Sequence, residues 1–112
     1  MKITDIITAL DLKIISGKNG INNVVTGGYV SDLLSDVMGN AKEGNIWITM
    51  QTHQNVIAVA SLKELAAVII VRGGKPDTDT AEKSNIENIP VLSTDLDSFN
   101  ITGRLFDLIK KE

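Results

Sequence analysis

The second half of the chain alternates apolar runs with helical patterns, and this alternation restricts the fold more than any other feature. The run "NIWITM", Asn45 to Met50, alternates two sets of side chains, as a strand with two different faces does. The run "AVIIV", Ala67 to Val71, is apolar throughout and is followed by Gly73–Gly74, which is typical of a strand buried on both faces. Pro90 can only open a strand, and Val91–Leu92 follow it.

A helical pattern follows each of these runs. His53 to Leu65 is apolar nearly all round, whereas Asp77 to Asn88 is polar and predicted to be exposed. Thr94 or Asp95 is expected to cap a last helix that carries the apolar residues Ile101, Leu105, Phe106, Leu108 and Ile109. Because the connections are short, the order is that of βαβ units, whose right-handed crossovers make the strands parallel.

The first part of the chain adds two helices and up to two strands. Apolar residues from Ile3 to Leu10 follow a helical stripe with Thr4 as its expected N-cap, and Leu12 to Ile15 indicates a short strand. Val24–Val25 forms another short apolar run. We therefore predict one α/β domain over residues 1–112, with a mainly parallel sheet of four or five strands flanked by helices.

Composition excludes several classes of function. The net charge is −3 and the sequence pI about 5.1, so we expect no nucleic-acid partner. The chain has no cysteine and a single histidine, His53, so disulfides, thiolate metal sites and histidine pairs are excluded, and no cofactor is expected. No apolar run approaches ~20 residues and no signal-peptide pattern precedes the first helix, which favours a cytoplasmic protein without a membrane segment.

Ligands of an open parallel sheet bind beyond the carboxyl ends of the strands, where each strand-to-helix loop presents a helix N-terminus. We expect four loops at this edge, within 26–32, 51–53, 72–75 and 93–95. The candidate ligand-binding residues are Thr26, Gly27, Gly28, Tyr29, Ser31, His53, Arg72, Gly73, Gly74, Lys75 and Thr94.

Two glycine pairs in these loops have alternative interpretations. "VRGGK", Val71 to Lys75, suits an anion, or it is a turn with a solvated Arg and Lys; a P-loop is excluded because position 69 is isoleucine. Gly27–Gly28 is expected to be a structural turn into a helix capped by Ser31, with a phosphate cradle as the alternative. No nucleophile–base pair or metal cluster is evident from the spacing, so we do not expect an enzyme.

The chain resembles the DRTGG domain family from Val24 to Leu108. The resemblance depends on the order and spacing of "TGGYVSDLLSDV", "AVIIVRGGKPD" and "IPVLSTD". The "DR" of the family's name is replaced by Val24–Val25, so no role of that pair is carried over. The resemblance implies a regulatory module of the kind found beside CBS domains in certain pyrophosphatases and inside some phosphate acetyltransferases. Its layout would be similar to the N-terminal domains of HPr kinase and, more distantly, of the Mur ligases.

The resemblance also implies dimer formation, adenine-nucleotide sensing in CBS-linked members, and an association of stand-alone members with clostridial iron-only hydrogenase systems. Two functions follow as expectations. The first is a non-catalytic regulatory or interaction module, a homodimer linked through a protein partner to a hydrogenase or another metabolic enzyme system. The second is a small-molecule sensor that binds an anionic ligand, such as an adenine nucleotide, at the strand C-terminal loops. The apolar helix at 53–65 either packs within the monomer or gives part of its surface to a partner.

Overall fold

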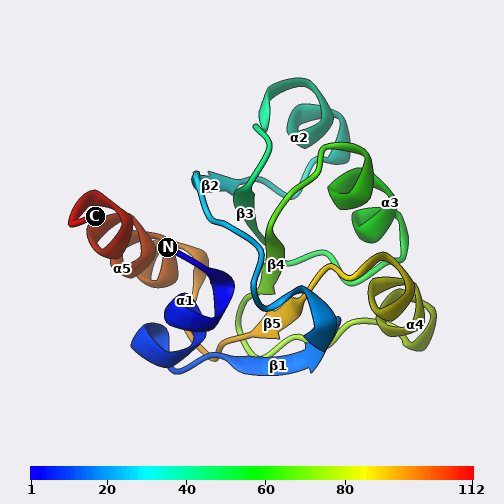
Figure 1. The fold of residues 1–112 in the computed structure, drawn as a ribbon. Helices are drawn as coiled ribbons and strands as arrows, with labels where there is room; N and C mark the ends of the chain where they lie inside the picture. The colour runs from blue at the N-terminus through cyan, green and yellow to red at the C-terminus, as the bar shows by residue number, and fades with distance from the viewer.

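The computed structural model describes residues 1–112 as one five-stranded sheet with strand order β1-β5-β4-β3-β2 and helices on both faces (Figure 1). Strands β2 to β5 are parallel, and β1 pairs antiparallel with β5, which confirms the predicted α/β fold with a mainly parallel sheet. The strands are β1 (Lys13–Ser16), β2 (Gly27–Val30), β3 (Asn45–Thr49), β4 (Ala67–Ile70) and β5 (Val91–Ser93). The helices are α1 (Ile3–Leu10), η1 (Lys18–Gly20), α2 (Leu34–Asn40), α3 (Asn55–Leu62), α4 (Thr78–Glu87) and α5 (Ser98–Lys110).

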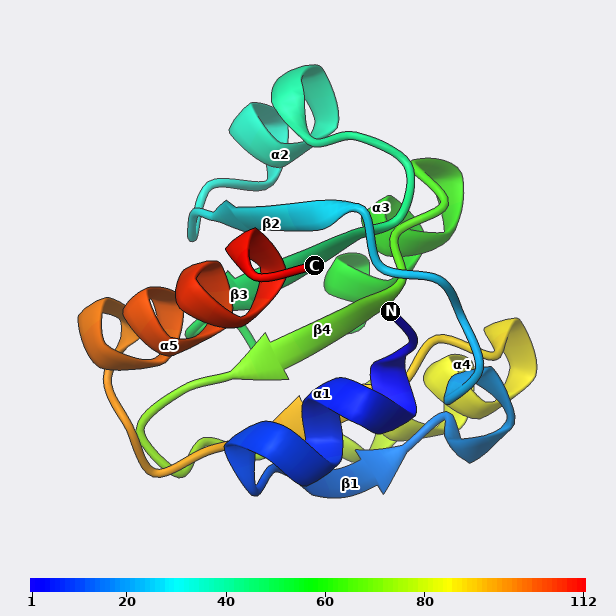
Figure 2. The same cartoon turned by 60° about the vertical axis from the view of Figure 1, so that its left-hand side comes forward.

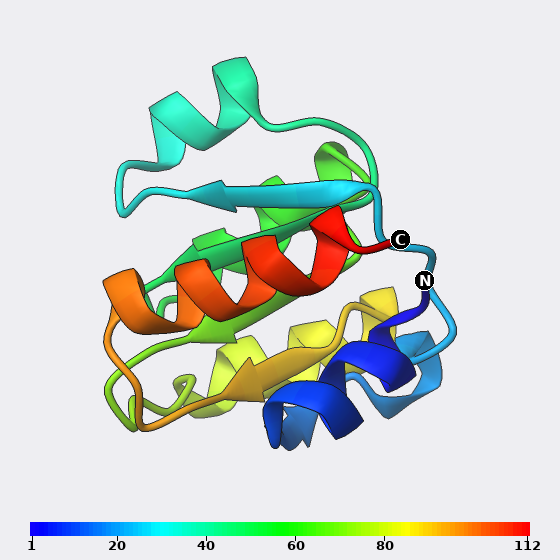
Figure 3. The ribbon, with the colours of Figure 1, turned by 90° about the vertical axis from the view of Figure 1, so that its left-hand side faces the viewer.

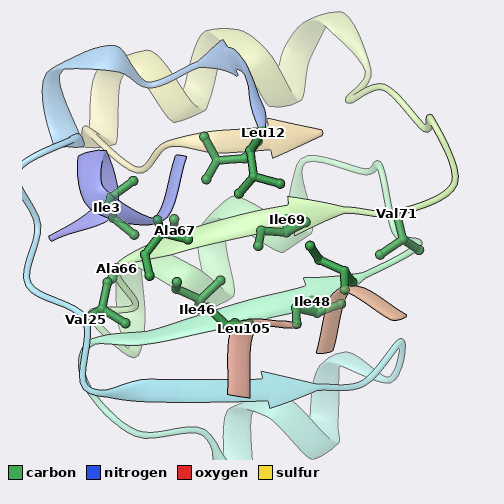
Figure 4. Packing of buried hydrophobic residues seen from close by; sticks show 13 residues of the cluster. Ile3, Leu12, Val25, Ile46, Ile48, Ala66, Ala67, Ile69, Val71 and Leu105 are labelled. Atoms are coloured by element: carbon green, nitrogen blue, oxygen red, sulfur yellow. The ribbon is translucent and has the colours of Figure 1, made fainter. Parts of the chain in front are cut away.

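Helices α1 and α5 cover one face of the sheet, and α2, α3 and α4 lie on the other (Figure 1, Figure 3). Each face has its own apolar cluster, and successive strand residues alternate between them because the side-chain period of a strand is two. Ile46, Ile48 and Ile69 lie on the side of Leu105 from α5 (Figure 4), whereas Trp47 and Val68 belong to the opposite cluster. The continuous apolar run of β4 is therefore buried on both faces, as predicted, and the alternating run of β3 is buried on both faces as well.

Three expected helix caps differ in the structure. The N-cap of α1 is Lys2, whose backbone N–H donates to Asp5 Oδ2 at 2.9 Å, while Thr4 lies inside the helix. The N-cap of α5 is Asp97, whose carboxylate accepts from Asn100 N at 2.8 Å, so the expected caps Thr94 and Asp95 are wrong. In each helix an acidic side chain accepts a hydrogen bond from a backbone N–H at the helix start. Local spacing does not fix the position of the N-cap to better than one or two residues. The third difference concerns α2, whose N-cap is Leu33, not Ser31.

The predicted turn at Gly27–Gly28 is also wrong, because both glycines belong to β2 and neither has a positive φ. A Cβ atom on Gly28 would stand 3.4 Å from Leu105 Cδ2, so the bare backbone lets α5 pack closely over this strand. Val24, expected in a strand, forms only an isolated bridge with Lys2. This neighbour of Gly28 belongs to a helix about 77 positions later in the sequence, which no local pattern indicates.

The apolar helix expected at 53–65 is the shorter α3, and its apolar residues are divided between core and surface. Val56, Ile57 and Ala60 are buried, while Ala58 and Leu62 are exposed on the outer side. Most of the apolar character of α3 is thus explained by packing within the monomer. No helix of the chain has the length and apolar character needed to cross a membrane.

Candidate functional site

The loops that follow β2 and β3 are joined at the carboxyl edge of the sheet through Asp32. Its carboxylate accepts hydrogen bonds from Thr49 Oγ1 at 2.8 Å and from Met50 N at 2.7 Å. The Gln51 side-chain amide donates to the backbone carbonyl of Asp32 at 2.9 Å. This carboxylate therefore holds two loops in a fixed relation through its Oδ1, which accepts both of these bonds.

The loop that follows β4 is held by the loop that follows β5. Arg72 and Gly73 both have left-handed backbone conformations, with φ of 57° and 69°. Arg72 N donates to Leu96 O at 2.9 Å and Gly73 N donates to Thr94 O at 2.8 Å. Gly74 N donates to Val71 O at 3.1 Å. The three amides are committed to carbonyls, so recognition of an anion in this loop is left to the exposed side chains of Arg72 and Lys75.

The charge of Arg72 acts on an edge that also carries carboxylates. The pKa of Asp97 is lowered, first because Asn100 donates backbone and side-chain hydrogen bonds to it and also because Arg72 lies close. Asp95 Oδ1 would stand 3.2 Å from a Cβ on Gly73, next in the chain to Arg72. An anionic ligand at Arg72 would thus approach two acidic side chains at the same time.

Tyr29, Ser31 and His53 each have a local partner. The Tyr29 hydroxyl donates to Asp36 Oδ1 at 2.8 Å, and this bond raises the pKa of Tyr29. Ser31 Oγ accepts from Leu33 N at 3.1 Å. His53 Nδ1 accepts from Asn55 N at 3.2 Å, at the start of α3. These bonds direct the polar atoms toward the beginnings of helices.

The structure does not bring all candidate ligand-binding residues together. Tyr29, Ser31, His53, Arg72, Gly73, Gly74, Lys75 and Thr94 lie in or next to the carboxyl ends of the strands. Thr26 and Gly27 lie at the opposite, amino end of β2, where Thr26 Oγ1 donates to Glu43 O at 2.7 Å and Asn45 Nδ2 donates to Thr26 Oγ1 at 3.2 Å. Because Gly27 and Gly28 belong to β2, this strand separates Thr26 from the carboxyl edge, where Thr26 is expected to lie.

Two hollows lie away from the four loops that the sequence predicts as the ligand site. One, of about 560 Å³, is at the amino edge and includes Glu43, Glu64 and Glu87 in its lining; a hydrogen bond to Glu64 raises the pKa of Glu43. The other, of about 260 Å³, lies between β2 and α5 and is lined by Gly28, Val30 and Phe106, among others. The spacing of Phe99 and Phe106, seven residues apart and off the buried stripe of α5, is the signal for an exposed apolar surface on this helix, and Phe106 also lines the second hollow.

Comparison with known proteins gives a family and a fold. A family model described as "DRTGG domain" matches residues 5–108, a longer stretch than the motifs alone cover. A search of curated proteins gave no match. A crystal structure of the CBS and DRTGG domains of the regulatory region of Clostridium perfringens pyrophosphatase, complexed with its activator diadenosine tetraphosphate, matches with a TM-score of 0.72 at 19% identity. The match covers 94% of this chain and 45% of that chain, so the present protein spans less than half of its structural neighbour.

Proposed function

Because this chain belongs to the DRTGG domain family, we propose that it is a non-catalytic regulatory or interaction module that acts as a homodimer. The observation that carries the proposal is the position of the exposed apolar side chains of this chain. Both phenylalanines of the chain lie on the outside of α5, where Phe99 is 86% and Phe106 is 66% exposed. Large apolar side chains that gather on a surface mark sites of protein association.

The polar groups of the carboxyl edge support a regulatory role over a catalytic one. The Asp32 carboxylate, His53 Nδ1 and the amides of Arg72 and Gly73 bond to neighbouring loops and helices, which rigidifies the edge. A general base needs a lone pair directed at a substrate proton, and the bonds to Asp32 Oδ1 and His53 Nδ1 direct these two atoms at the protein's own loops.

The proposed partner is an enzyme system of metabolism, with an iron-only hydrogenase as the first to test. The support for this link is the resemblance of "TGGYVSDLLSDV" to stand-alone members of the family. The experiment has two parts. Sedimentation velocity over a wide concentration range measures the mass of the protein alone, and a dimer is expected. Co-sedimentation with the purified hydrogenase, together with its turnover in the presence and absence of the protein, then tests the link; unchanged mass and turnover would refute it.

The second candidate function is a sensor of an anionic ligand such as an adenine nucleotide. The observation that favours it is the pair of exposed cationic side chains, Arg72 and Lys75, beside the carboxyl edge. The structural neighbour was solved with diadenosine tetraphosphate, which makes adenine nucleotides the first ligands to try.

Thermal unfolding against AMP, ADP, ATP, diadenosine polyphosphates and NAD tests this function. A ligand present at ~100 times its Kd adds about 2.7 kcal/mol to the free energy of unfolding, which raises the Tm by several degrees. Unchanged melting across all of these compounds would refute nucleotide sensing and would leave the interaction module.

A further inference from the structure

β2 forms an open edge of the sheet, with α5 on one side of it and α2 on the other (Figure 1, Figure 2). Ser31 N donates to Ile48 O at 3.3 Å, so the backbone groups of Gly27, Tyr29 and Ser31 face β3. Because these groups alternate along a strand, the N–H and C=O of Gly28 and Val30 point away from the sheet. No loop, turn or side-chain hydrogen bond uses them.

The two edges of the sheet are built differently. The β1 edge carries the exposed Lys13, and its pairing with β5 is interrupted by a register shift between Ile14 and Ser16. Charged residues and bulges of this kind keep an edge from pairing with another strand. β2 has the sequence Gly-Gly-Tyr-Val, with no charge and no proline, and its register with β3 is regular throughout. The β2 edge therefore lacks the charged residue and the register shift that protect the β1 edge.

Apolar side chains surround this open edge. Val30 lies on the strand, and Phe99 and Phe106 lie on α5, which runs across the same face (Figure 3). The hollow of about 260 Å³ at Gly28 adjoins them. The Thr102 hydroxyl, which also lines this hollow, is buried and has no hydrogen-bond partner. We define the β2 face as Gly28, Val30, Phe99, Thr102 and Phe106.

We propose that the β2 face binds the β2 face of a second copy of this chain, with the two β2 strands pairing antiparallel about a two-fold axis at Tyr29. The proposal rests on the homodimer of the proposed function and assigns its interface. In this register Gly28 of each protomer lies opposite Val30 of the other. Each such pair exchanges two hydrogen bonds, so that all the free N–H and C=O groups of Gly28 and Val30 are used.

Side-chain shape supports the same register. Residues that lie opposite each other in an antiparallel pair point to the same face of the sheet. Val30 and Gly28 are on the face of β2 that α5 covers, since Gly28 faces Leu105 and Val30 lines the same hollow. The valine of one protomer therefore lies over the bare backbone of the other, beside its α5. A strand of a different sequence would not place a valine and a glycine in this reciprocal arrangement.

The area of the β2 face is in the range that a dimer requires. A phenylalanine contributes ~200 Å² when fully buried, so the two exposed phenylalanines offer roughly 300 Å² in each protomer. The paired strands, Val30 and the lining of the hollow add to this on both sides. The total approaches the ~1,000 Å² above which specific interfaces begin.

The first test compares variants by sedimentation velocity. We expect the wild-type chain to be a dimer, and Val30→Lys and Phe106→Glu each to raise the dimer dissociation constant at least tenfold. Ile86→Glu is the matched control, because Ile86 is 77% exposed on α4, on the other face of the sheet, and this variant should dimerise as the wild type does. Circular dichroism and the Tm of monomeric samples verify that each variant is folded.

The second test locates the two-fold axis without disrupting the interface. Opposed residues of a non-hydrogen-bonded antiparallel pair have Cα atoms about 4.5 Å apart, within the range of a disulfide. The natural chain has no cysteine, so Tyr29→Cys is expected to give an oxidised, reducible dimer, whereas Ile86→Cys stays monomeric on a denaturing gel.

The outcomes separate this inference from the function on which it rests. A wild-type dimer that persists in Val30→Lys and Phe106→Glu and is not cross-linked by Tyr29→Cys overturns the β2 face while the homodimer stands. A wild-type chain that is monomeric at every concentration overturns both.

Discussion

The Tyr29 hydroxyl and the Asp36 carboxylate, joined by a hydrogen bond of 2.8 Å, fasten the open edge strand β2 to helix α2. The bond lowers the pKa of Asp36 and raises the pKa of Tyr29, because it favours an ionised carboxylate facing a protonated phenol. The edge strand thus has a polar attachment to α2 on one face and an apolar contact with α5 on the other.

The first prediction concerns stability in acid. A folded-state pKa below the ordinary value of 3.8 gives Asp36 a stabilising contribution that is present above pH 3.8 and is lost as the pH falls through the folded-state pKa. Tyr29→Phe removes the largest cause of that shift. We expect the variant to be less stable than the wild type at neutral pH and the difference to shrink in acid, as measured by urea unfolding at a series of pH values. A difference that stays constant with pH would contradict the assignment.

The second prediction is a difference in stability that depends on pH in the opposite direction. The Glu64 carboxyl group raises the pKa of Glu43 above 4.5, so the contribution of Glu43 to stability is present below pH 4.5 and is lost as the pH rises through the folded-state pKa. Glu43→Gln should therefore be more stable than the wild type at neutral pH and should lose that advantage in acid. Urea unfolding measures this, with Glu82→Gln on α4 as the control. An equal gain in the control would attribute the effect to net charge alone.

The third prediction concerns Gly17, which has a φ of 72° and precedes η1. An added Cβ would run into the backbone carbonyl of Ile89, and the left-handed conformation adds to the penalty. We expect Gly17→Ala to lower the free energy of unfolding by about 3 kcal/mol or more. Gly39→Ala is the control: the site in α2 has no atom within 4 Å of the added Cβ, so this change should be neutral or should stabilise by about 0.5–1 kcal/mol. Chemical denaturation of both variants measures these changes in the free energy of unfolding.

The fourth prediction uses the left-handed conformation of Arg72. Its φ of 57° is costly for a residue with a Cβ and free of that cost for glycine. Arg72→Gly should raise the free energy of unfolding by roughly 0.5–1 kcal/mol, while Arg72→Ala, which keeps the strain, should not. If the carboxyl edge binds an anionic nucleotide, both variants should lose affinity by a similar factor. Binding that survives both changes would remove Arg72 from the site.

The sequence was most informative where burial and periodicity agree. Strand β4 is predicted by its continuous apolar run, which is typical of a strand buried on both faces, and strand β3 by the alternation of Ile46 and Ile48 with Trp47. The glycine pair of β2 is predicted as a turn because glycine favours turns, whereas the strand position of Gly28, next to Leu105 of α5, depends on a residue that is distant in the sequence. The cap of α5 is misplaced because Thr94, Asp95 and Asp97 all satisfy the same local rule, whereas α1 begins after Lys2, a residue type that does not signal an N-cap.

The sequence predicts only which edge of the sheet carries the candidate site. Topology alone brings Ser31, His53, Arg72 and Thr94 to one end of the parallel strands. The sequence does not reveal that the amides of the Arg72 loop are used by carbonyls of the next loop, since that pairing depends on two left-handed residues in succession. Phe106 is counted with the apolar residues of the last helix in the sequence, and only its seven-residue spacing from Phe99, off the buried stripe, indicates that both are exposed.

The buried Trp47 is the only tryptophan of the chain, and its indole N–H donates to Ser31 O at 2.7 Å, immediately after β2. Tryptophan fluorescence of this protein consequently reports on one place, the end of β2. Any movement of the edge strand or of the loop that leads into α2 changes the surroundings of the single indole. Its fluorescence therefore follows events at that edge in the natural chain, with no dye attached.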